Sequence, residues 1–155
     1  MVFLNEHQQD ARIDFAKAYA NTVPQQIVPW LQLLIMSQAS ELGTRGEAMA
    51  KAHLQGLGYR ILECNWRYGR DEIDLVAMDG EELVIVEVKT RTTNFFGDPA
   101  GFLKQGQQKR IIRTADAYIK EKNLDVETRF DVVGIVLNAR EQELRHIKRV
   151  FIPGP

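Results

Sequence analysis

The chain has 155 residues, of which 45% are hydrophobic and 26% are charged, and its formal net charge is −1. These values are typical of one soluble domain of ordinary size, with enough chain to bury a substantial core. A net charge near zero gives no global argument for nucleic acid as a partner. The single cysteine, Cys64, excludes an intramolecular disulfide and a thiolate zinc cluster, and it fits a reducing compartment.

The most apolar segment, residues 27–36, does not have the length of a membrane span. It is interrupted by Pro29 and Gln32 and is far shorter than the ~20 residues that a spanning helix needs. It also lacks the basic start and the small-residue cleavage site of a secretory signal. We therefore expect a cytoplasmic protein without a membrane partner.

Residues 1–40 differ in character from the rest of the chain. Apolar residues at helical spacing between 11 and 19 predict a helix, Pro24 and Pro29 punctuate a link, and a second apolar segment follows at 30–35. Such a segment must be buried, either on the main domain or against a second subunit in a homodimer. We predict a helical extension over residues 1–40 and one main domain over 41–155.

The main domain alternates between helical and strand patterns. A helix is expected from about Thr44 to Gln55, because Thr44-Arg45-Gly46-Glu47 matches a capping box in which Glu47 satisfies backbone donors. The further elements, in chain order, are a strand at 59–66, a hairpin of 72–78 and 83–89, a loop at 92–101, a helix at 104–120, a buried strand at 129–137 and an edge strand at 144–152. This order predicts an α/β sandwich with a mixed sheet.

The hairpin carries the chemically informative side chains. Along residues 72–78, Asp74 points away from the apolar side chains at 73, 75 and 77. Along residues 83–89, Glu87 and Lys89 point away from the valines at 84, 86 and 88. The alternation therefore predicts two acids and one ammonium on the same face of the hairpin.

The turn of the hairpin decides how the two acids face each other. Residues 79–82, Asp-Gly-Glu-Glu, are a strong hairpin signal. If all four form the loop, Met78 pairs with Leu83 and Asp74 lies directly opposite Glu87, with Cβ atoms roughly 4.5 to 5.5 Å apart. A two-residue Asp-Gly loop makes the acids diagonal neighbours, about 7 to 8 Å apart. They share a face in either register.

Two carboxylates at that distance repel each other and raise each other's pKa unless a cation lies between them. Mg²⁺ or Mn²⁺ would remove the conflict, because such hard ions take one or two carboxylates together with substrate phosphate. Lys89 could then stabilise charge on a scissile phosphate or orient the attacking water. The alternative is that Lys89 only neutralises the two acids in a surface ion-pair cluster.

Basic side chains are concentrated after the hairpin. Residues 88–115 contain a single acid, Asp98. The stretch is a suitable place for a phosphate backbone, or else it is a solvated helix face. The candidate nucleic-acid contacts are Arg67, Arg70, Arg91, Lys104, Lys109, Arg110 and Arg113.

The apolar stripe of the helix at 104–120 continues backwards at helical spacing onto Gln108. Its amide is either satisfied locally at the helix end or points into the site, where it would bind phosphate or water. Asp131, near the start of its strand, has a similar pair of interpretations, as the cap of a turn or as a ligand contact.

Several short motifs together resemble the YraN-type bacterial family. They are Gly46-Glu47-x-x-Ala50, Gly58-Tyr59, Asn65-Trp66-Arg67, Glu72-Ile73-Asp74-Leu75-Val76, Val86-Glu87-Val88-Lys89-Thr90-Arg91 and Arg129-Phe130-Asp131-Val132-Val133. That family is assigned to the restriction-endonuclease-like superfamily, near the archaeal Holliday-junction resolvases. The resemblance covers about residues 41–152. It implies a three-layer sandwich with a mixed central sheet flanked by helices.

The resemblance also implies roles for individual residues. Asp74, Glu87 and the carbonyl of Val88 would hold the metal, and Lys89 would be the catalytic lysine. Glu47 would be the helix acid that holds a water at the metal.

The second helix departs from the family pattern. Gln108 matches a catalytic-site glutamine that commonly follows a basic residue in this family, whereas Gln107 precedes it here. Asp71 stands where relatives usually have glycine, and residues 1–40 match no counterpart.

These observations lead to one main expectation and two alternatives. The main expectation is an endonuclease that uses Mg²⁺ or Mn²⁺ to cleave DNA, including branched or structured forms. The first alternative is a nucleic-acid-binding or scaffolding module that keeps the nuclease fold without turnover. The second is a protein-binding role through residues 24–36.

Overall fold

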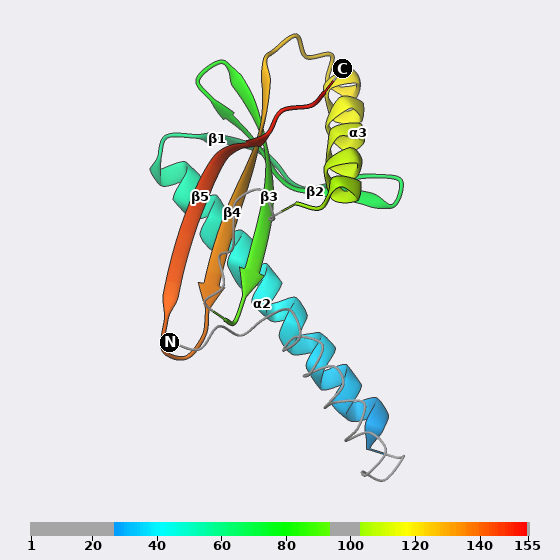
Figure 1. Ribbon diagram of the computed structural model, residues 1–155, viewed down its shortest axis with the longest axis vertical. Coiled ribbons are helices and arrows are strands. Elements are labelled where there is room, and N and C mark those ends of the chain that lie inside the picture. The colour runs from blue at the N-terminus through cyan, green and yellow to red at the C-terminus, as the bar shows by residue number, and fades with distance from the viewer. Residues whose placement is uncertain (1–26, 94–102, 155) are drawn as a thin grey trace. The chain divides into compact units, whose positions relative to one another are not determined.

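The computed structural model describes residues 27–93 and 103–154. The chain divides into two compact units, residues 1–41 and residues 42–155. The elements, shown in Figure 1, are α2 (Val28–Gly56), β1 (Arg60–Tyr68), β2 (Asp71–Asp79), β3 (Glu82–Arg91), α3 (Gln105–Glu121), β4 (Thr128–Leu137) and β5 (Gln142–Phe151). The predicted order of one helix, three strands, one helix and two strands is confirmed.

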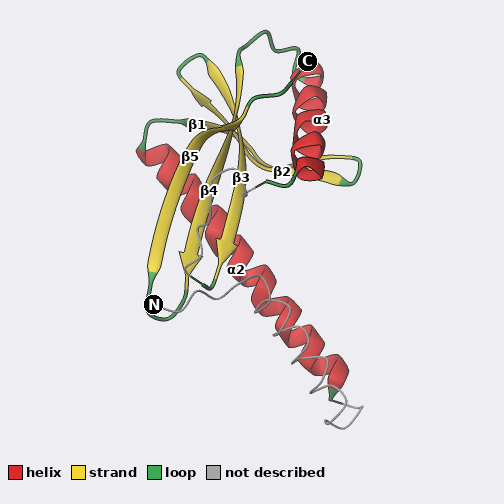
Figure 2. Cartoon of the chain, viewed as in Figure 1, coloured by secondary structure: helices red, strands yellow, loops and turns green. Residues whose placement is uncertain are grey.

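The five strands form one mixed sheet in the order β1-β2-β3-β4-β5. β3 and β4 are parallel, and α3 connects them, while the other neighbouring pairs are antiparallel. The prediction of a mixed sheet is therefore confirmed, and so is the prediction that the last strand lies at an edge (Figure 2).

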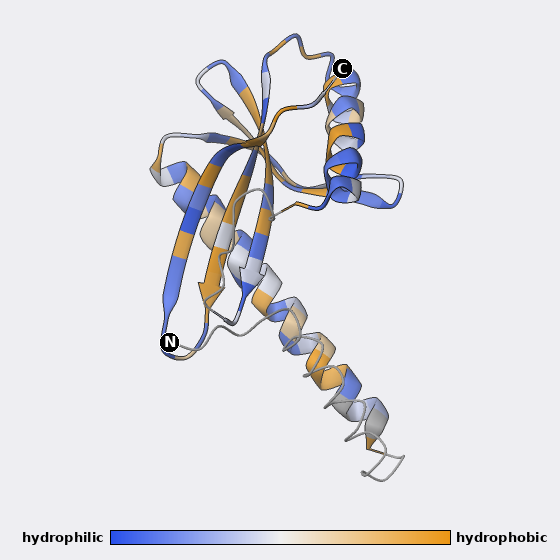
Figure 3. Ribbon diagram, viewed as in Figure 1, coloured by the Kyte–Doolittle hydropathy of each residue, from blue (hydrophilic) through white to orange (hydrophobic). Residues whose placement is uncertain are grey.

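Each face of the sheet is covered by a helix. On one face, Ala50 and Leu54 of α2 pack with a cluster that includes Val86. On the other face, Ile111 and Tyr118 belong to a second cluster. β4 lies between the two clusters, is buried along most of its length and is largely hydrophobic (Figure 3). The unit from 42 to 155 is thus an α/β domain of three layers, in which Asp74 and Glu87 are acids within β2 and β3.

The first helix begins earlier than the sequence predicted. α2 starts at Val28, so Thr44 lies well inside the helix and the prediction of a capping box there is wrong. Pro29 lies in the first turn, where proline is tolerated because the backbone N–H needs no helical partner. The predicted helix around residues 11–19 lies outside the described residues, as does most of the expected loop at 92–101.

The start of α2 carries exposed apolar side chains. Trp30 is 72% exposed and Met36 is 66% exposed, and Ile27, Leu33, Leu34 and Ile35 are exposed as well. No helix in the described ranges is long and apolar enough to cross a membrane.

The hairpin of β2 and β3 has the register that the sequence predicted for a four-residue turn. Met78 pairs with Leu83, and Asp79 also pairs with Glu82, so that only Gly80 and Glu81 remain unpaired. Gly80 has a positive φ of 63°, which a two-residue hairpin requires and glycine adopts without strain.

Candidate metal and phosphate site

The site begins where β2 and β3 stop pairing. Their last residue pair is Leu75 with Val86. One residue further, the Asp74 carboxylate accepts a hydrogen bond from the backbone N–H of Val88 at 2.6 Å. The carboxylate thus takes the place of a backbone acceptor on the neighbouring strand, and Asp74 and Glu87 line the same pocket. The predicted common face of the two acids thus has a structural basis.

Glu87 is held by two donors on the same oxygen. Lys89 Nζ lies 2.5 Å from Glu87 Oε1, and Gln107 Nε2 of α3 donates to that oxygen at 2.6 Å. The Glu87 side chain is 14% exposed and that of Lys89 is 27% exposed, so the pair is more strongly coupled than an ion pair in open solvent. This arrangement fixes one carboxylate oxygen of Glu87.

Asp74 is in surroundings that oppose its ionisation. Burial raises the pKa of Asp74 to about 7, and the charges of Glu87 and Glu47 act in the same direction. The hydrogen bond from the Val88 N–H and the charge of Lys89 lower the pKa and offset part of this effect. Acids with such raised pKa values are typical of functional sites, because a bound cation would stabilise the charged form.

Glu47 approaches this region from α2. It accepts a hydrogen bond from Asn65 Nδ2 at 2.9 Å, and the same amide donates to Glu72 at 3.0 Å. The helix comes close to β3 because residue 46 is glycine: an added Cβ would lie 1.8 Å from Thr90 Oγ1. Since Thr44 does not cap the helix, Glu47 has no capping task, and its hydrogen bond with Asn65 links α2 to β1.

Asp74, Glu87 and Gln107 line a small pocket. Its volume is about 190 Å³, and its polar lining residues are Arg70, Asp71, Glu72, Asp74, Glu87, Gln107 and Arg110. Acids, guanidinium groups and an amide thus converge on one concave surface, which is the kind of environment that binds an ion together with an anionic ligand.

The donor set fits Mg²⁺ better than a metal that needs a full protein cage. Within the described residues, no group of three or more His, Cys, Asp or Glu could hold a metal ion by itself. Asp74 and Glu87 supply two carboxylates to the pocket. Mg²⁺ commonly takes one or two carboxylates and completes its shell with water and substrate phosphate, whereas zinc needs three or four protein ligands.

The structure separates the two neighbouring glutamines of α3. Gln107 contacts Glu87 and lines the pocket, whereas the Gln108 amide donates to the backbone carbonyl of Leu103 at 2.9 Å. Of the two interpretations of Gln108, the local one therefore has a contact in the structure. The apolar stripe of this helix points to Gln108 and not to Gln107, although Gln107 also lies one helical turn before the buried Ile111.

The basic candidates are not equivalent either. Arg67 donates to Glu72 at 2.6 Å, and Arg113 forms an ion pair with Asp71. Arg70 and Arg110 line the pocket. The remaining candidates, Arg91, Lys104 and Lys109, are not among the residues of the pocket wall.

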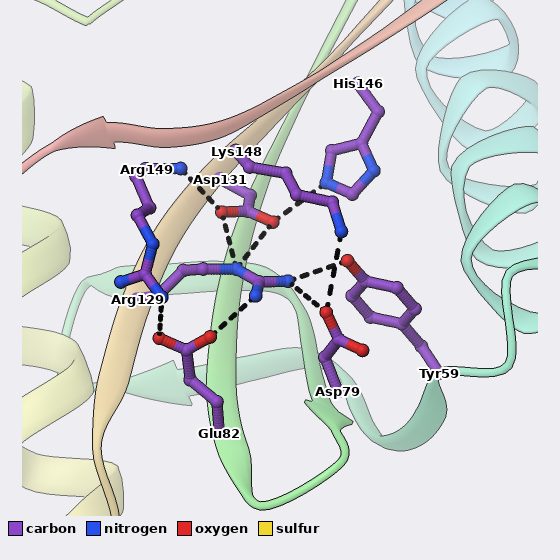
Figure 4. A network of polar contacts seen from close by, with 8 residues as sticks. All are labelled: Tyr59, Asp79, Glu82, Arg129, Asp131, His146, Lys148 and Arg149. Atoms are coloured by element: carbon purple, nitrogen blue, oxygen red, sulfur yellow. Dashed lines mark hydrogen bonds and ion pairs between the residues drawn. The ribbon is translucent and has the colours of Figure 1, made fainter.

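A second polar network lies on the α2 face of the sheet and explains Asp131. Its side chain is fully buried and accepts hydrogen bonds from Arg129 and from the Arg149 backbone N–H, with His146 Nε2 at 2.8 Å (Figure 4). Asp131 thus contacts other protein groups instead of capping a turn.

Arg129 is the centre of that network. Only 5% of its side chain is exposed, and it bonds to Glu82 at 2.6 Å, to Asp79 at 2.8 Å and to Tyr59 Oη at 2.7 Å (Figure 4). It thereby joins the hairpin turn to β4. The only sign of this role in the sequence is an arginine and an aspartate two residues apart on a buried strand.

The described domain is an α/β protein with a mixed five-stranded sheet and a carboxylate-lysine cluster beside a polar pocket. The model of the uncharacterised protein family UPF0102 matches residues 46–135. The chain belongs to this family, and the resemblance to YraN-type proteins is confirmed at that level.

Relatives in the family are similar over most of their length. A UPF0102 protein of Christiangramia forsetii is 40% identical over 116 residues, which cover 75% of this chain and 98% of the relative. One from Bacteroides thetaiotaomicron is 42% identical over 118 residues, covering 76% and 98%. One from Chlorobaculum tepidum is 39% identical over 128 residues, covering 77% and 98%.

Proposed function

We propose that the protein is a divalent-metal-dependent endonuclease with a restriction-endonuclease-like fold that hydrolyses phosphodiester bonds in DNA, including branched or structured forms. The observation that carries this proposal is the convergence of Asp74 and Glu87 at one pocket, with Lys89 paired to Glu87. The raised pKa of Asp74 supports it, because a cation would relieve the repulsion between the acids.

Each residue of the site has a role that follows from its chemistry. Asp74 and Glu87 would hold the ion, with the Val88 carbonyl as a further ligand. A bound Mg²⁺ would supply charge neutralisation at the phosphate and a more acidic attacking water. Lys89, held by Glu87, donates hydrogen bonds to the phosphate oxygens as negative charge develops on them. Glu47 orients the attacking water.

The decisive experiment compares wild type with single alanine variants at 74, 87 and 89. Each protein is incubated with Mg²⁺ or Mn²⁺ and with junction, flap, linear duplex and single-stranded DNA. We expect cleavage by wild type and by the control Asp125→Ala, whose side chain is exposed and outside the pocket, and none by the three variants. Equal cleavage by wild type and Asp74→Ala would exclude this site.

One observation favours a second function, a DNA-binding or scaffolding module without turnover. Lys89 and Gln107 already satisfy one oxygen of Glu87, and no three-ligand cluster exists among the described residues. Retention of DNA without metal uptake or cleavage would support this module. Assembly of a homodimer through residues 24–36 stays a prediction, to be tested by the mass in solution after deletion of the first 35 residues.

A further inference from the structure

Two arginines line the pocket without an internal counter-ion. Arg70 and Arg110 both belong to the pocket wall, and neither forms an ion pair with another residue in the part of the chain that the structure describes. Arg67 and Arg113 are instead each tied to a neighbouring acid. Because guanidinium groups bind phosphate through paired N–H donors, Arg70 and Arg110 offer a place for one phosphate beside the two acids.

The lining of the pocket suits a phosphate better than a base. Seven of its eight lining residues are polar or charged, and none is aromatic. A nucleobase is held mainly by stacking on a ring, which this lining does not offer. We therefore expect the base attached to the bound phosphate to lie outside the pocket, on the adjoining surface.

An exposed aromatic residue is paired in the sheet with a residue of the pocket wall. Tyr68 pairs in the sheet with Asp71, which lines the pocket, and Tyr68 is 52% exposed. Its ring is within 2° of parallel to that of Trp66, with ring centroids 6.3 Å apart, and Trp66 contacts Tyr118 edge to face at 5.1 Å. Neighbouring aromatic rings thus support Tyr68 while half of its surface stays open.

We propose that this site binds a DNA strand with an unpaired base, which stacks on Tyr68 while Arg70 and Arg110 hold the neighbouring phosphate. The inference rests on the proposed function, because it names the substrate class of the same pocket. A base inside a duplex is covered on both faces, so only an unpaired or extruded base can offer a face to the ring. Basic side chains beside an exposed aromatic ring are the pattern of single-strand binding.

Binding can be tested without cleavage. All variants are made in an Asp74→Asn background and kept in EDTA, so that the DNA stays intact. Fluorescence anisotropy then gives the affinity for labelled oligothymidylate and for a blunt duplex of equal length. The variants are Tyr68→Ala, Tyr68→Phe and the double change Arg70→Gln with Arg110→Gln. Arg140→Gln, an exposed arginine outside the pocket wall, is the charge control.

The two kinds of variant have different expected effects. Tyr68→Ala should weaken oligothymidylate binding on the order of tenfold and leave duplex binding unchanged, whereas Tyr68→Phe keeps the stacking surface and should bind like the parent. The double arginine variant should bind more weakly, and the salt dependence of its log K should fall by about 0.7 for each phosphate that the protein no longer neutralises. Arg140→Gln should change neither the affinity nor the salt dependence.

Three results would overturn the proposal: unchanged oligothymidylate binding by Tyr68→Ala, an equal loss on both DNA forms, or an effect of Arg140→Gln as large as that of the double variant. Thermal melting shows whether each variant is folded. If Tyr68→Ala is unfolded, Tyr68→Phe is used in its place, and if the double arginine variant is unfolded, the single arginine variants are measured. A wild type that cleaves DNA without any effect of Tyr68 refutes only the substrate class. Binding through Tyr68 without any cleavage in Mg²⁺ refutes only the nuclease.

Discussion

Asp74 accepts the backbone N–H of Val88 at 2.6 Å, just beyond the last residue pair of β2 and β3. This bond holds the carboxylate in place, while burial and the charges of Glu87 and Glu47 oppose its ionisation. A group that is well anchored and poorly stabilised in its charged form is typical of a binding or catalytic position. The hydrogen bond from Val88 and the raised pKa of Asp74 can be tested separately.

Asp74→Asn is expected to stabilise the metal-free protein at pH 8. The pKa of Asp74 is raised to about 7 in the folded chain, so between about pH 4 and pH 7 the folded state keeps a proton that the unfolded state has lost. The stability of the wild type therefore falls as pH rises from about 4 to about 7. Asparagine removes the charge and keeps an acceptor for Val88. The expected gain is a few kcal/mol, at about 1.4 kcal/mol per pKa unit, measured by urea unfolding in EDTA.

The pH dependence identifies the cause of that gain. At pH 5 the wild-type carboxyl is mostly protonated in the folded state, so the gain should fall to less than half of its value at pH 8. Asp125→Asn, an exposed control, should change little at either pH. A gain of the same size at both pH values would contradict the raised pKa.

Metal binding should strengthen as the pH rises through 7. Asp74 must lose its proton to bind a cation, and its pKa is raised to about 7. The affinity for Mg²⁺ should therefore increase about tenfold between pH 6 and pH 8. Calorimetry in buffers with different heats of ionisation would detect the released proton. Removal of the ion by EDTA should lower the melting temperature again, and an affinity that does not depend on pH would argue against Asp74 as a ligand.

Gln107→Ala is expected to affect catalysis and Gln108→Ala to affect stability. Gln107 donates to Glu87 in the pocket, so its loss should lower kcat/KM for DNA cleavage with little change in stability. Gln108 donates to the Leu103 carbonyl, so its loss should cost about 1 kcal/mol of stability and leave kcat/KM nearly unchanged. Cleavage kinetics and urea unfolding separate the two. The reverse pattern would restore Gln108 as the glutamine of the site.

Gly46→Ala should destabilise the fold although alanine favours helices. The new Cβ would lie 1.8 Å from Thr90 Oγ1, and overpacking of this kind costs about 1 to 3 kcal/mol. Gly43→Ala in the same helix is the matched control, because nothing lies within 4 Å of its added Cβ. Gly43→Ala should raise the free energy of unfolding by up to about 1 kcal/mol, because alanine has a higher helix propensity than glycine. Equal effects of the two changes in urea unfolding would mean that α2 does not depend on this close approach.

Arg129→Met should be strongly destabilising. The change leaves Asp131, whose side chain is fully buried, without its guanidinium partner, and it releases Asp79 and Glu82. Loss of one partner from such a buried pair costs about 3 to 5 kcal/mol. Arg149→Ala removes an exposed pair with Glu82 and should cost less than about 1 kcal/mol. Similar denaturation midpoints for both variants would show that the buried contacts of Arg129 contribute no more to the free energy of unfolding than the exposed pair does.

The hairpin was predictable because its signals are local. Alternating side chains predict the face of Asp74 in either register, whereas the turn signal leaves two registers open, of which the structure has the one that pairs Met78 with Leu83. The start of α2 was not predictable in the same way. Pro29 was interpreted as part of a link, whereas it occupies the first turn of a helix, and a capping motif at Thr44 occurs inside that helix. A local motif does not reveal whether a helix has already begun.

The contacts that complete the site depend on tertiary packing. Gln107 and Gln108 both lie on the side of α3 that leads to Ile111, and only the docking of the helix decides which amide reaches Glu87. The partners of Arg129 come from three strands and from Tyr59. Periodicity places a residue on a face, but it does not name the neighbour across the sheet.

The two unpaired residues of the hairpin, Gly80 and Glu81, have a consequence for the distant acids. Because strand side chains alternate, a pairing of β2 with β3 that is one residue out of register would carry Asp74 to the opposite side of the sheet from Glu87. A longer loop that keeps Asp79 paired with Glu82 would leave both acids in place, so the retention of this pair matters more for the site than the identity of the residues in the loop.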